Sequence, residues 1–389
     1  MQYADPAATQ IVDLVINPSA VRVPRRAGEF AAFNCVAFDE VLHTVRAWPG
    51  YAPTPLVHLR GAAAMLGVAD VAYKDEGARF GLGSFKALGG AYAVARLASR
   101  NGGRQLTVAS ATDGNHGRSV AWGAQLHGFP CVIYVHAGVS EARVEAITRY
   151  GADVRRVAGN YDDSVRQCAA DAAAQGWHVV SDTSYPGYQD IPRDVMLGYT
   201  VLMSEVYEQM GEELPTHVFV QCGVGGLAAA VAAFYCAVAA ERRPTIVVVE
   251  PERADCLLRS ASAGALHRVE GDLDTVMAGL ACGEPSEIAW NILREAGDAF
   301  VSIRDQAALA AMKMLAFPTT GDPAVVSGES GAAGLAGLNA MASDNEARRS
   351  IGLTAASRVL LIGTEGDTDA ALYERIVGCS GANVRARNA

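Results

Sequence analysis

Several features of common protein classes are missing from this sequence. It has no basic patch of the kind that binds nucleic acid, and its formal net charge is -10. No apolar run reaches the length of a membrane span. Residues 1–18 lack the basic and then apolar regions of a signal peptide, so none is expected. We therefore expect neither nucleic acid nor a membrane among the partners.

Paired cysteines are missing as well. The eight cysteines are scattered and no two form a C-x-x-C motif, so no zinc or other metal site is expected. Several fall in apolar segments and are interpreted as small core residues. Cys256 and Cys282 lie in less regular segments where they could approach each other, but two free thiols are the favoured interpretation. Cysteine usage of this kind predicts a cytoplasmic protein.

Short apolar runs alternate with helical patterns along most of the chain. Half of its 389 residues are hydrophobic and forty are glycine, which suffices for a large core and more than one domain. The alternation predicts an α/β fold with parallel sheets covered on both faces. Residues 251–283 and 318–330 are less regular and are predicted to form loops near a cleft. The predicted strands are 71–74, 106–109, 131–135, 153–157, 178–181, 217–221, 246–250 and 358–363, and the predicted helices are 117–126, 141–150, 164–174 and 227–239.

A glycine-rich turn, QCGVGGL from Gln221, follows one predicted strand and opens the next helix. Its backbone N–H groups can converge on an anion, and the helix N-terminus adds a favourable dipole. The turn lacks the spacing of a dinucleotide fingerprint and the Gly-Lys-Ser/Thr of a triphosphate loop. It therefore suits a single small phosphate, with a purely geometric role of the glycines as the alternative.

Lys86 lies in the run GLGSFKALGG, after a hydroxyl and an aromatic residue and at the start of an apolar helical stretch. A partly desolvated lysine amine can attack a carbonyl, which is how pyridoxal 5'-phosphate (PLP) is carried as a Schiff base. The alternative is a solvated lysine at a helix start. A serine hydrolase built on Ser84 and Lys86 is excluded, because it would need Ser-x-x-Lys and a Ser-Asp-Asn partner.

Two further polar turns follow predicted strands. In ATDGNHG, Asn115 could bond the phenolic oxygen of a cofactor ring, although Asp, Asn and Thr are also common helix caps. In LIGTEGDTD, Thr364 could meet a pyridine nitrogen, with a polar turn that caps the next helix as the alternative. Glu365 and Asp367 lie close by, so the residue that faces a ring is left open.

Together these motifs resemble the fold-type II PLP enzymes, the family of the tryptophan synthase β-chain, threonine dehydratase and cysteine synthase. The Thr54-Pro55-Leu56 segment is similar too, and the family has its lysine, asparagine loop, glycine loop and late hydroxyl in this order. The resemblance implies that Lys86 forms the Schiff base, Asn115 contacts the ring oxygen, and Thr364 faces the ring nitrogen. The cofactor contacts it implies are Phe85, Lys86, Asn115, Gly223, Val224, Gly225, Gly226, Leu227 and Thr364.

Within this fold type the chain most resembles the diaminopropionate ammonia-lyases, over about residues 73–369. The most specific segments are KDEGARFGLGSFKALGG, ATDGNHGR, MAGLACGEPS, SGESGAAGL and TEGDTD. The resemblance implies α,β-elimination of 2,3-diaminopropionate to pyruvate and two ammonia. A neutral hydroxyl at the ring nitrogen does not enforce a protonated pyridine, which suits elimination better than transamination.

Two carboxylates are the candidates for substrate chemistry. Most relatives that act on serine, threonine or cysteine derivatives have a small or neutral residue where this chain has Asp113. A carboxylate there can hold a substrate ammonium or act as acid or base, and Asp182 would add a second negative charge. By analogy, Lys86 would be the base for the L-isomer and Asp113 the base for the D-isomer. The structural alternatives are a helix cap for Asp113 and a turn for Asp182.

The resemblance also implies two α/β domains with twisted, mainly parallel sheets and an active site in the cleft between them. We assign residues 1–89 and 203–389 to a large PLP-binding domain and residues 90–202 to a small mobile domain, whose closure would exclude water. A homodimer is expected from the family. The alternatives are a related PLP lyase or β-replacement enzyme acting on serine, threonine or another β-substituted alanine, and a non-catalytic relative, which would usually lack the lysine.

Overall fold

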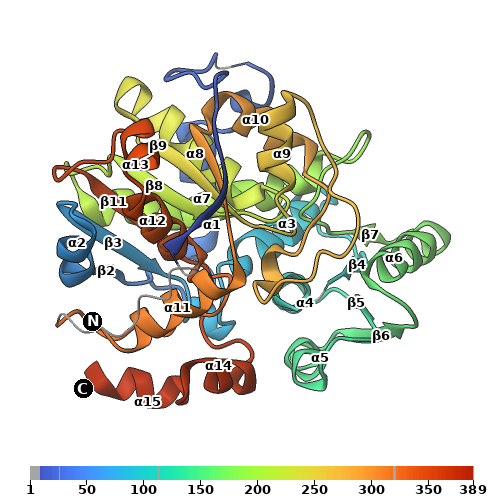
Figure 1. Ribbon diagram of the computed structural model, residues 1–389. Helices are drawn as coiled ribbons and strands as arrows, with labels where there is room; N and C mark the ends of the chain where they lie inside the picture. Colours follow the sequence, from blue (N-terminus) through green and yellow to red (C-terminus); the bar gives the residue numbers. More distant parts are fainter. Residues whose placement is uncertain (1–8, 26, 113, 319–320, 389) are drawn as a thin grey trace.

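Two β-sheets organise the chain (Figure 1). The computed structural model describes residues 9–25, 27–112, 114–318 and 321–388. The larger sheet has the strand order β1-β10-β9-β8-β11-β3-β2, and the smaller has the order β6-β5-β4-β7. The strands are β1 (Ile11–Ile16), β2 (Leu56–His58), β3 (Asp70–Asp75), β4 (Val108–Ala111), β5 (Cys131–His136), β6 (Asp153–Val157), β7 (His178–Val179), β8 (His217–Gln221), β9 (Thr245–Pro251), β10 (Ala299–Ile303) and β11 (Arg358–Gly363).

The sheets are parallel except at the two edges of the larger one. There β1 pairs with β10 and β2 pairs with β3 in the antiparallel sense, while every other pairing is parallel. All five residues of β8 are buried, as expected for a strand covered on both faces. The α/β fold with mainly parallel sheets is therefore confirmed. All eight predicted strands are present, but β1, β2 and β10 were not predicted.

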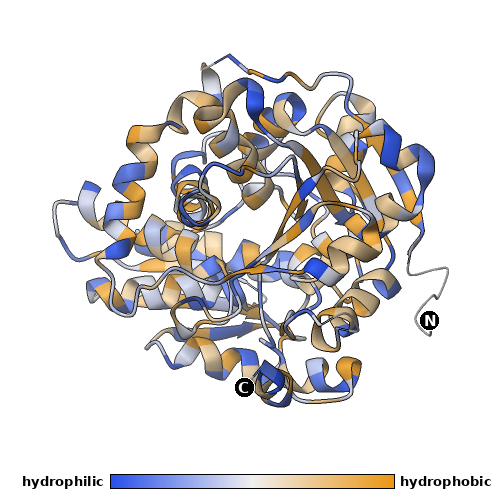
Figure 2. Ribbon diagram, turned by 90° about the vertical axis from the view of Figure 1, so that its left-hand side faces the viewer, coloured by the Kyte–Doolittle hydropathy of each residue, from blue (hydrophilic) through white to orange (hydrophobic). Residues whose placement is uncertain are grey.

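Helices cover both sheets, and Figure 2 shows largely hydrophobic strands inside and outer helices that alternate between polar and apolar residues. The predicted helices at 117–126, 141–150, 164–174 and 227–239 are present with ends shifted by a few residues. No helix of the described residues is long and apolar enough to cross a membrane. The helices are α1 (Cys35–Arg46), α2 (Arg60–Leu66), α3 (Lys86–Arg100), α4 (Asn115–His127), α5 (Glu141–Thr148), α6 (Tyr161–Gln175), α7 (Asp190–Met210), α8 (Gly226–Val238), α9 (Cys256–Ala263), α10 (Glu287–Ala296), α11 (Asp305–Ala316), α12 (Ala333–Ser343), α13 (Asn345–Ser350), α14 (Ala370–Val377) and α15 (Gly381–Arg385).

One predicted loop contains a helix. Residues 251–283 include α9, whose second and third backbone N–H groups, at Leu257 and Leu258, donate to the Glu250 carboxylate at 2.9 and 2.7 Å. Glu250 lies in β9, so this helix start is fixed by a contact that its own periodicity does not reveal. The described residues of 318–330 form neither helix nor strand, as predicted.

Helices α3, α4 and α7 pack closely, and in Figure 1 α3 and α4 lie between the two sheets. A Cβ atom at Gly89 would come within 2.3 Å of the Tyr199 ring, and one at Gly90 within 2.5 Å of the Ser119 hydroxyl. The glycine pair of the KALGG segment therefore allows α3 to approach both neighbours. All four strands of the smaller sheet fall within residues 90–202, while the division into two domains stays a prediction.

A fully buried charge cluster ties β3 to α7. Lys74 Nζ lies 2.7 Å from Glu205 Oε2, and Arg79 bonds both Glu205 and Glu76 at 2.7 Å. Lys74 also donates to the carbonyl of Thr54 at 2.8 Å. Two cations and two carboxylates thus balance one another without solvent. Because each buried charge depends on the others, the cluster is satisfied in only one arrangement of these segments.

We expect Glu205→Gln to lower the free energy of unfolding by about 3–5 kcal/mol, because it leaves buried cations uncompensated. Glu208→Gln is the matched control, since Glu208 lies on the same helix in an exposed ion pair with Arg46, where a loss of about 1 kcal/mol or less is expected. Urea unfolding followed by circular dichroism measures both. Similar losses in the two variants would contradict the role of the cluster.

Candidate active site

Lys86 and Asp182 form an ion pair between the two sheets. Lys86 is the first residue of α3, and Asp182 follows β7 of the smaller sheet. Nζ of Lys86 donates to Asp182 Oδ2 at 2.5 Å, and the ring centroids of Phe85 and Tyr199 lie 5.4 and 5.9 Å from Nζ. Burial opposes both charges, but their mutual attraction outweighs it, so the pKa of Lys86 is raised and that of Asp182 is lowered.

Backbone bonds place Lys86 beside the segment that contains Thr364. The N–H of Phe85 donates to the Thr364 carbonyl at 3.0 Å, and that of Gly366 donates to the Gly83 carbonyl at 3.0 Å. Ser119 on α4 donates its hydroxyl to the Lys86 carbonyl at 2.5 Å. The lysine motif, the late hydroxyl motif and α4 therefore meet, as their order in the resembling family implies.

The predicted ring contacts Asn115 and Thr364 both have side-chain partners. Asn115, the first residue of α4, donates Nδ2 to Glu365 Oε2 at 2.7 Å and accepts from Arg118 at 2.5 Å. Thr364 is buried, and its Oγ1 accepts from Gln221 Nε2 at 2.9 Å. Neither Asn115 nor Thr364 makes a helix-cap bond itself. Their turns do bond the helices that follow, because Thr112 accepts from the Gly117 N–H in the first turn of α4, and Asp369 accepts from the Leu372 N–H of α14.

The glycine-rich turn of residues 223–227 can hold an anion. Gly225 has a φ of 104°, and a Cβ atom there would lie 2.7 Å from Ala289 Cβ. Gly226 opens α8, so the turn leads directly into a helix N-terminus. None of the five backbone N–H groups donates to another group within the described part of the chain. Unpaired N–H groups at a helix N-terminus fit a phosphate.

Serine hydroxyls connect the Asp182 loop to this turn. Ser184 and Ser286 share a hydrogen bond of 2.7 Å between their hydroxyls, and the N–H of Ser286 donates to the Val224 carbonyl at 2.8 Å. Three predicted features, Lys86, Asp182 and the turn, are thus fixed relative to one another. Asp113 lies outside the described residues.

Several polar residues near these groups were not predicted, and Glu365 was named only as an open candidate. His116 places Nδ1 3.9 Å from Asp182 Oδ2, and Tyr199 lies near Lys86. Burial raises the pKa of Glu329, to about 7, and also that of Glu365. His116, Glu329 and Glu365 fall within the distinctive segments ATDGNHGR, SGESGAAGL and TEGDTD, which could have indicated them. Tyr199 lies within the long helix α7 and carries no comparable signal.

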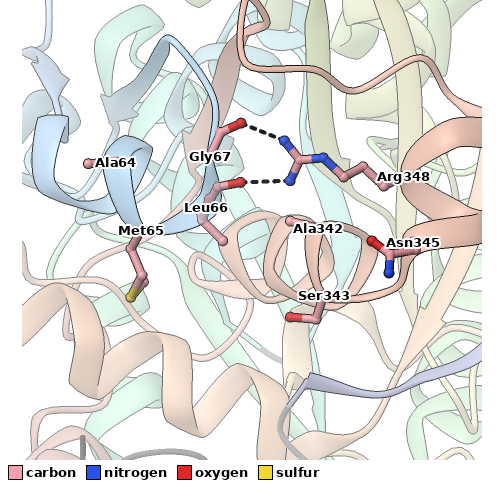
Figure 3. Close-up of a pocket in the computed structure, with 8 residues that line it drawn as sticks. All are labelled: Ala64, Met65, Leu66, Gly67, Ala342, Ser343, Asn345 and Arg348. Atoms are coloured by element: carbon pink, nitrogen blue, oxygen red, sulfur yellow. Dashed lines mark hydrogen bonds between the residues drawn. The ribbon is translucent and has the colours of Figure 1, made fainter.

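A separate pocket of about 400 Å³ lies between α2 and the α12–α13 connection (Figure 3). Arg348 donates to the carbonyls of Leu66 and Gly67 at 2.7 and 2.5 Å, which satisfies the C-terminal end of α2. None of the predicted site residues lines this pocket.

Comparisons with known proteins agree with this geometry. The pyridoxal-phosphate dependent enzyme family matches residues 47–364. The diaminopropionate ammonia-lyase of Escherichia coli (strain K12) is 43% identical over 350 residues, which cover 84% of this chain and 88% of that protein. The chain belongs to the diaminopropionate ammonia-lyase family of pyridoxal-phosphate dependent enzymes. The predicted fold type is thereby confirmed.

Solved structures of the family superpose over almost the whole chain. A holo diaminopropionate ammonia-lyase from Escherichia coli has a TM-score of 0.87 and 38% identity, covering 95% of this chain and 97% of that one. The same lyase in complex with an aminoacrylate-PLP azomethine reaction intermediate has a TM-score of 0.86 and 38% identity, with coverages of 94% and 96%.

Removing the Asp182 carboxylate should change the reactivity of the Lys86 amine. The sequence has lysines only at positions 74, 86 and 313. In Asp182→Asn, burial acts on Lys86 without its carboxylate, so its pKa should fall and its acetylation at pH 8 should rise about tenfold or more relative to exposed Lys313. Peptide mapping by mass spectrometry of cofactor-free, full-length protein measures the ratio.

Asp190→Asn is the control for this measurement, because Asp190 is an exposed carboxylate paired with Arg193. Its acetylation ratio should equal that of the wild type. An unchanged or lower ratio in Asp182→Asn would show that the pair does not set the charge of Lys86.

Proposed function

We propose that this protein is a PLP-dependent ammonia-lyase that converts 2,3-diaminopropionate to pyruvate and two ammonia. The observation that carries the proposal is the position of Lys86, whose amine meets Asp182 close to a glycine-rich turn that can hold an anion. The 43% identity to a diaminopropionate ammonia-lyase supports the substrate. A related lyase or β-replacement enzyme for serine, threonine or another β-substituted alanine is the second candidate.

The residues present fit the cofactor. Bound PLP supplies an electron sink for the carbanion formed next to the substrate amino group. We assign Lys86 Nζ to its attachment, residues 223–227 to its phosphate, Asn115 to its ring oxygen and Phe85 to the site beside it. Gln221 donates to Thr364 Oγ1, so the hydroxyl hydrogen of Thr364 is free to be donated to the ring nitrogen. A ring nitrogen that accepts this hydrogen bond would be unprotonated.

The charges of the site suit a substrate with two amino groups. Asp182 is held as a carboxylate. Once Lys86 is engaged elsewhere, Asp182 can bind the second ammonium group of the substrate, which serine and threonine lack. That group leaves when its C–N bond breaks and takes the electron pair, so an ammonium that keeps its three hydrogens departs as neutral ammonia.

The proposal also includes a domain movement, a homodimer and a cytoplasmic location. Residues 90–202 would move as a small domain against residues 1–89 and 203–389, consistent with the four-stranded sheet within that range. A homodimer follows from the family resemblance. A cytoplasmic location is supported by the cysteine usage, including the free, buried thiol of Cys256.

Lys86→Ala should abolish pyruvate formation from L-2,3-diaminopropionate in an assay coupled to lactate dehydrogenase. Borohydride reduction of the wild type should attach the cofactor to the peptide containing Lys86, and the variant should show no such adduct. Lys313→Ala, which removes an exposed lysine, should keep full activity. A wild type with the adduct but a higher kcat/KM for serine or threonine would favour the second candidate.

Asp113→Asn should separate the two isomers of the substrate. We assign Asp113 to removal of the Cα proton from the D-isomer and Lys86 to its removal from the L-isomer. The variant should therefore lose about 10²-fold or more in kcat with D-2,3-diaminopropionate and much less with the L-isomer. Initial rates with each pure isomer test this, and equal losses would contradict the assignment.

A further inference from the structure

His116 is a buried residue whose ring has one partner and one open position. Its Nε2 lies 3.0 Å from the carbonyl of Val180 and its side chain is 9% exposed. A carbonyl only accepts, so Nε2 carries the hydrogen, and a neutral ring has its lone pair at Nδ1. Nδ1 is buried without a hydrogen-bond partner among the described residues.

This open nitrogen faces the carboxylate that holds Lys86. Nδ1 lies 3.9 Å from Asp182 Oδ2, the same oxygen that accepts from Lys86 Nζ at 2.5 Å. Two lone pairs that face each other are unfavourable in a buried site. The ammonium of Lys86 lowers the cost of this arrangement, because it compensates the negative charge of the carboxylate.

Few other titratable groups act on this trio. The phenols of Tyr188 and Tyr199 lie near Asp182, and burial keeps both neutral by raising their pKa values. The Cys282 thiol lies near Lys86. The pKa of His116 is lowered, chiefly by burial, while Asp182 raises it and Lys86 lowers it. Within the part of the chain that the structure describes, loss of the charge on Lys86 therefore leaves Asp182 as the charged neighbour, and Asp182 favours the imidazolium.

We propose that His116 takes up a proton at Nδ1 and becomes the ion-pair partner of Asp182 when the ammonium of Lys86 is withdrawn. A new N–H bond forms from the Nδ1 lone pair, with a proton that Lys86 gives up as it bonds to a carbonyl carbon. The broken N–H bond of Lys86 leaves its electron pair on Nζ. A rotation of the Asp182 carboxylate or one water molecule spans the remaining gap to Nδ1.

His116 is thus a positioning residue that acts through Asp182. As an imidazolium it holds the carboxylate ionised and in place while Lys86 is occupied, so that the carboxylate remains able to bind an ammonium group. The inference rests on the proposed function only in taking Lys86 as the group that loses its charge.

The pKa of His116 in full-length protein tests the proposal, measured by NMR of isotope-labelled imidazoles in the wild type and in Lys86→Met. The resonance is assigned among the eight histidines with His116→Gln. We expect the pKa to rise by about one unit or more in Lys86→Met, because Asp182 is then the only charge among the described residues that acts closely on His116. In Lys86→Met combined with Asp182→Asn, the rise should disappear.

His217 is a matched internal control. It is also buried, its Nε2 lies 2.9 Å from the Ile351 carbonyl, and its Nδ1 has a partner in Thr216. Its titration should be the same in all variants. A His116 pKa that does not rise in Lys86→Met, or that rises equally without Asp182, would overturn the proposal, whereas a purely structural histidine would show no dependence on Lys86.

Wild-type protein to which PLP is added gives a second readout that needs no substitution at Lys86. The His116 resonance should shift toward the protonated form as Lys86 becomes attached, and no shift upon attachment would contradict the proposal. If PLP does not attach to Lys86 but the pKa rises in Lys86→Met, the proposed function fails while the pairing of His116 with Asp182 stands.

Discussion

A cluster of four buried charges holds together segments that are far apart in the sequence. Its members are Lys74, Glu76, Arg79 and Glu205. Burial of each charge is costly, and the cost is offset only when all four meet with good geometry. The chain between β3 and Lys86 runs through this cluster, and α7 supplies Glu205. The position of α7 therefore also determines the path of the chain segment that leads to Lys86.

Helix α7 carries this constraint into the active site. Tyr199 lies less than two turns before Glu205 and places its ring near Lys86 Nζ. Gly89 lets α3 approach that ring closely, so the helix that begins with Lys86 and the helix that anchors the charge cluster form one packed unit. Asp182 reaches the same lysine from the smaller sheet. The reactive amine is thus surrounded by elements whose own positions are determined by packing and charge, which suits a site that must keep its geometry during reaction.

The sequence predicted the parts of the fold that depend on local patterns. The fully buried parallel strand β8 is a continuous apolar run and was found with correct ends, whereas the equally buried β10 was missed. Strand β2 has only three residues, and β1 is half exposed at an edge, so neither gives a strong local pattern. Helix α9 depends on Glu250, which belongs to another element. Predictions failed where tertiary contacts rather than local periodicity decide the structure.

The candidate site likewise has a part that the sequence predicted and a part that depends on tertiary contacts. Lys86, Thr364 and the glycine turn lie in motifs that could be recognised, and the structure brings them together. The bonds that join them, such as Asn115 to Glu365 or Gln221 to Thr364, link residues more than a hundred positions apart. A motif indicates which residues matter, but it does not say which side chains they bond, because that depends on how strand ends meet in the folded sheets.

The scarcity of lysine has a chemical consequence for a protein of this family. Aldehydes condense with primary amines but not with guanidinium groups, and most of the positive charge here is carried by arginine. Lys74 is locked in a buried ion pair, which leaves Lys313 as the one exposed lysine side chain in the part of the chain that the structure describes. An aldehyde cofactor therefore meets very few competing side-chain amines, so that its selectivity for one lysine is set by the scarcity of alternatives as well as by the fit of its pocket.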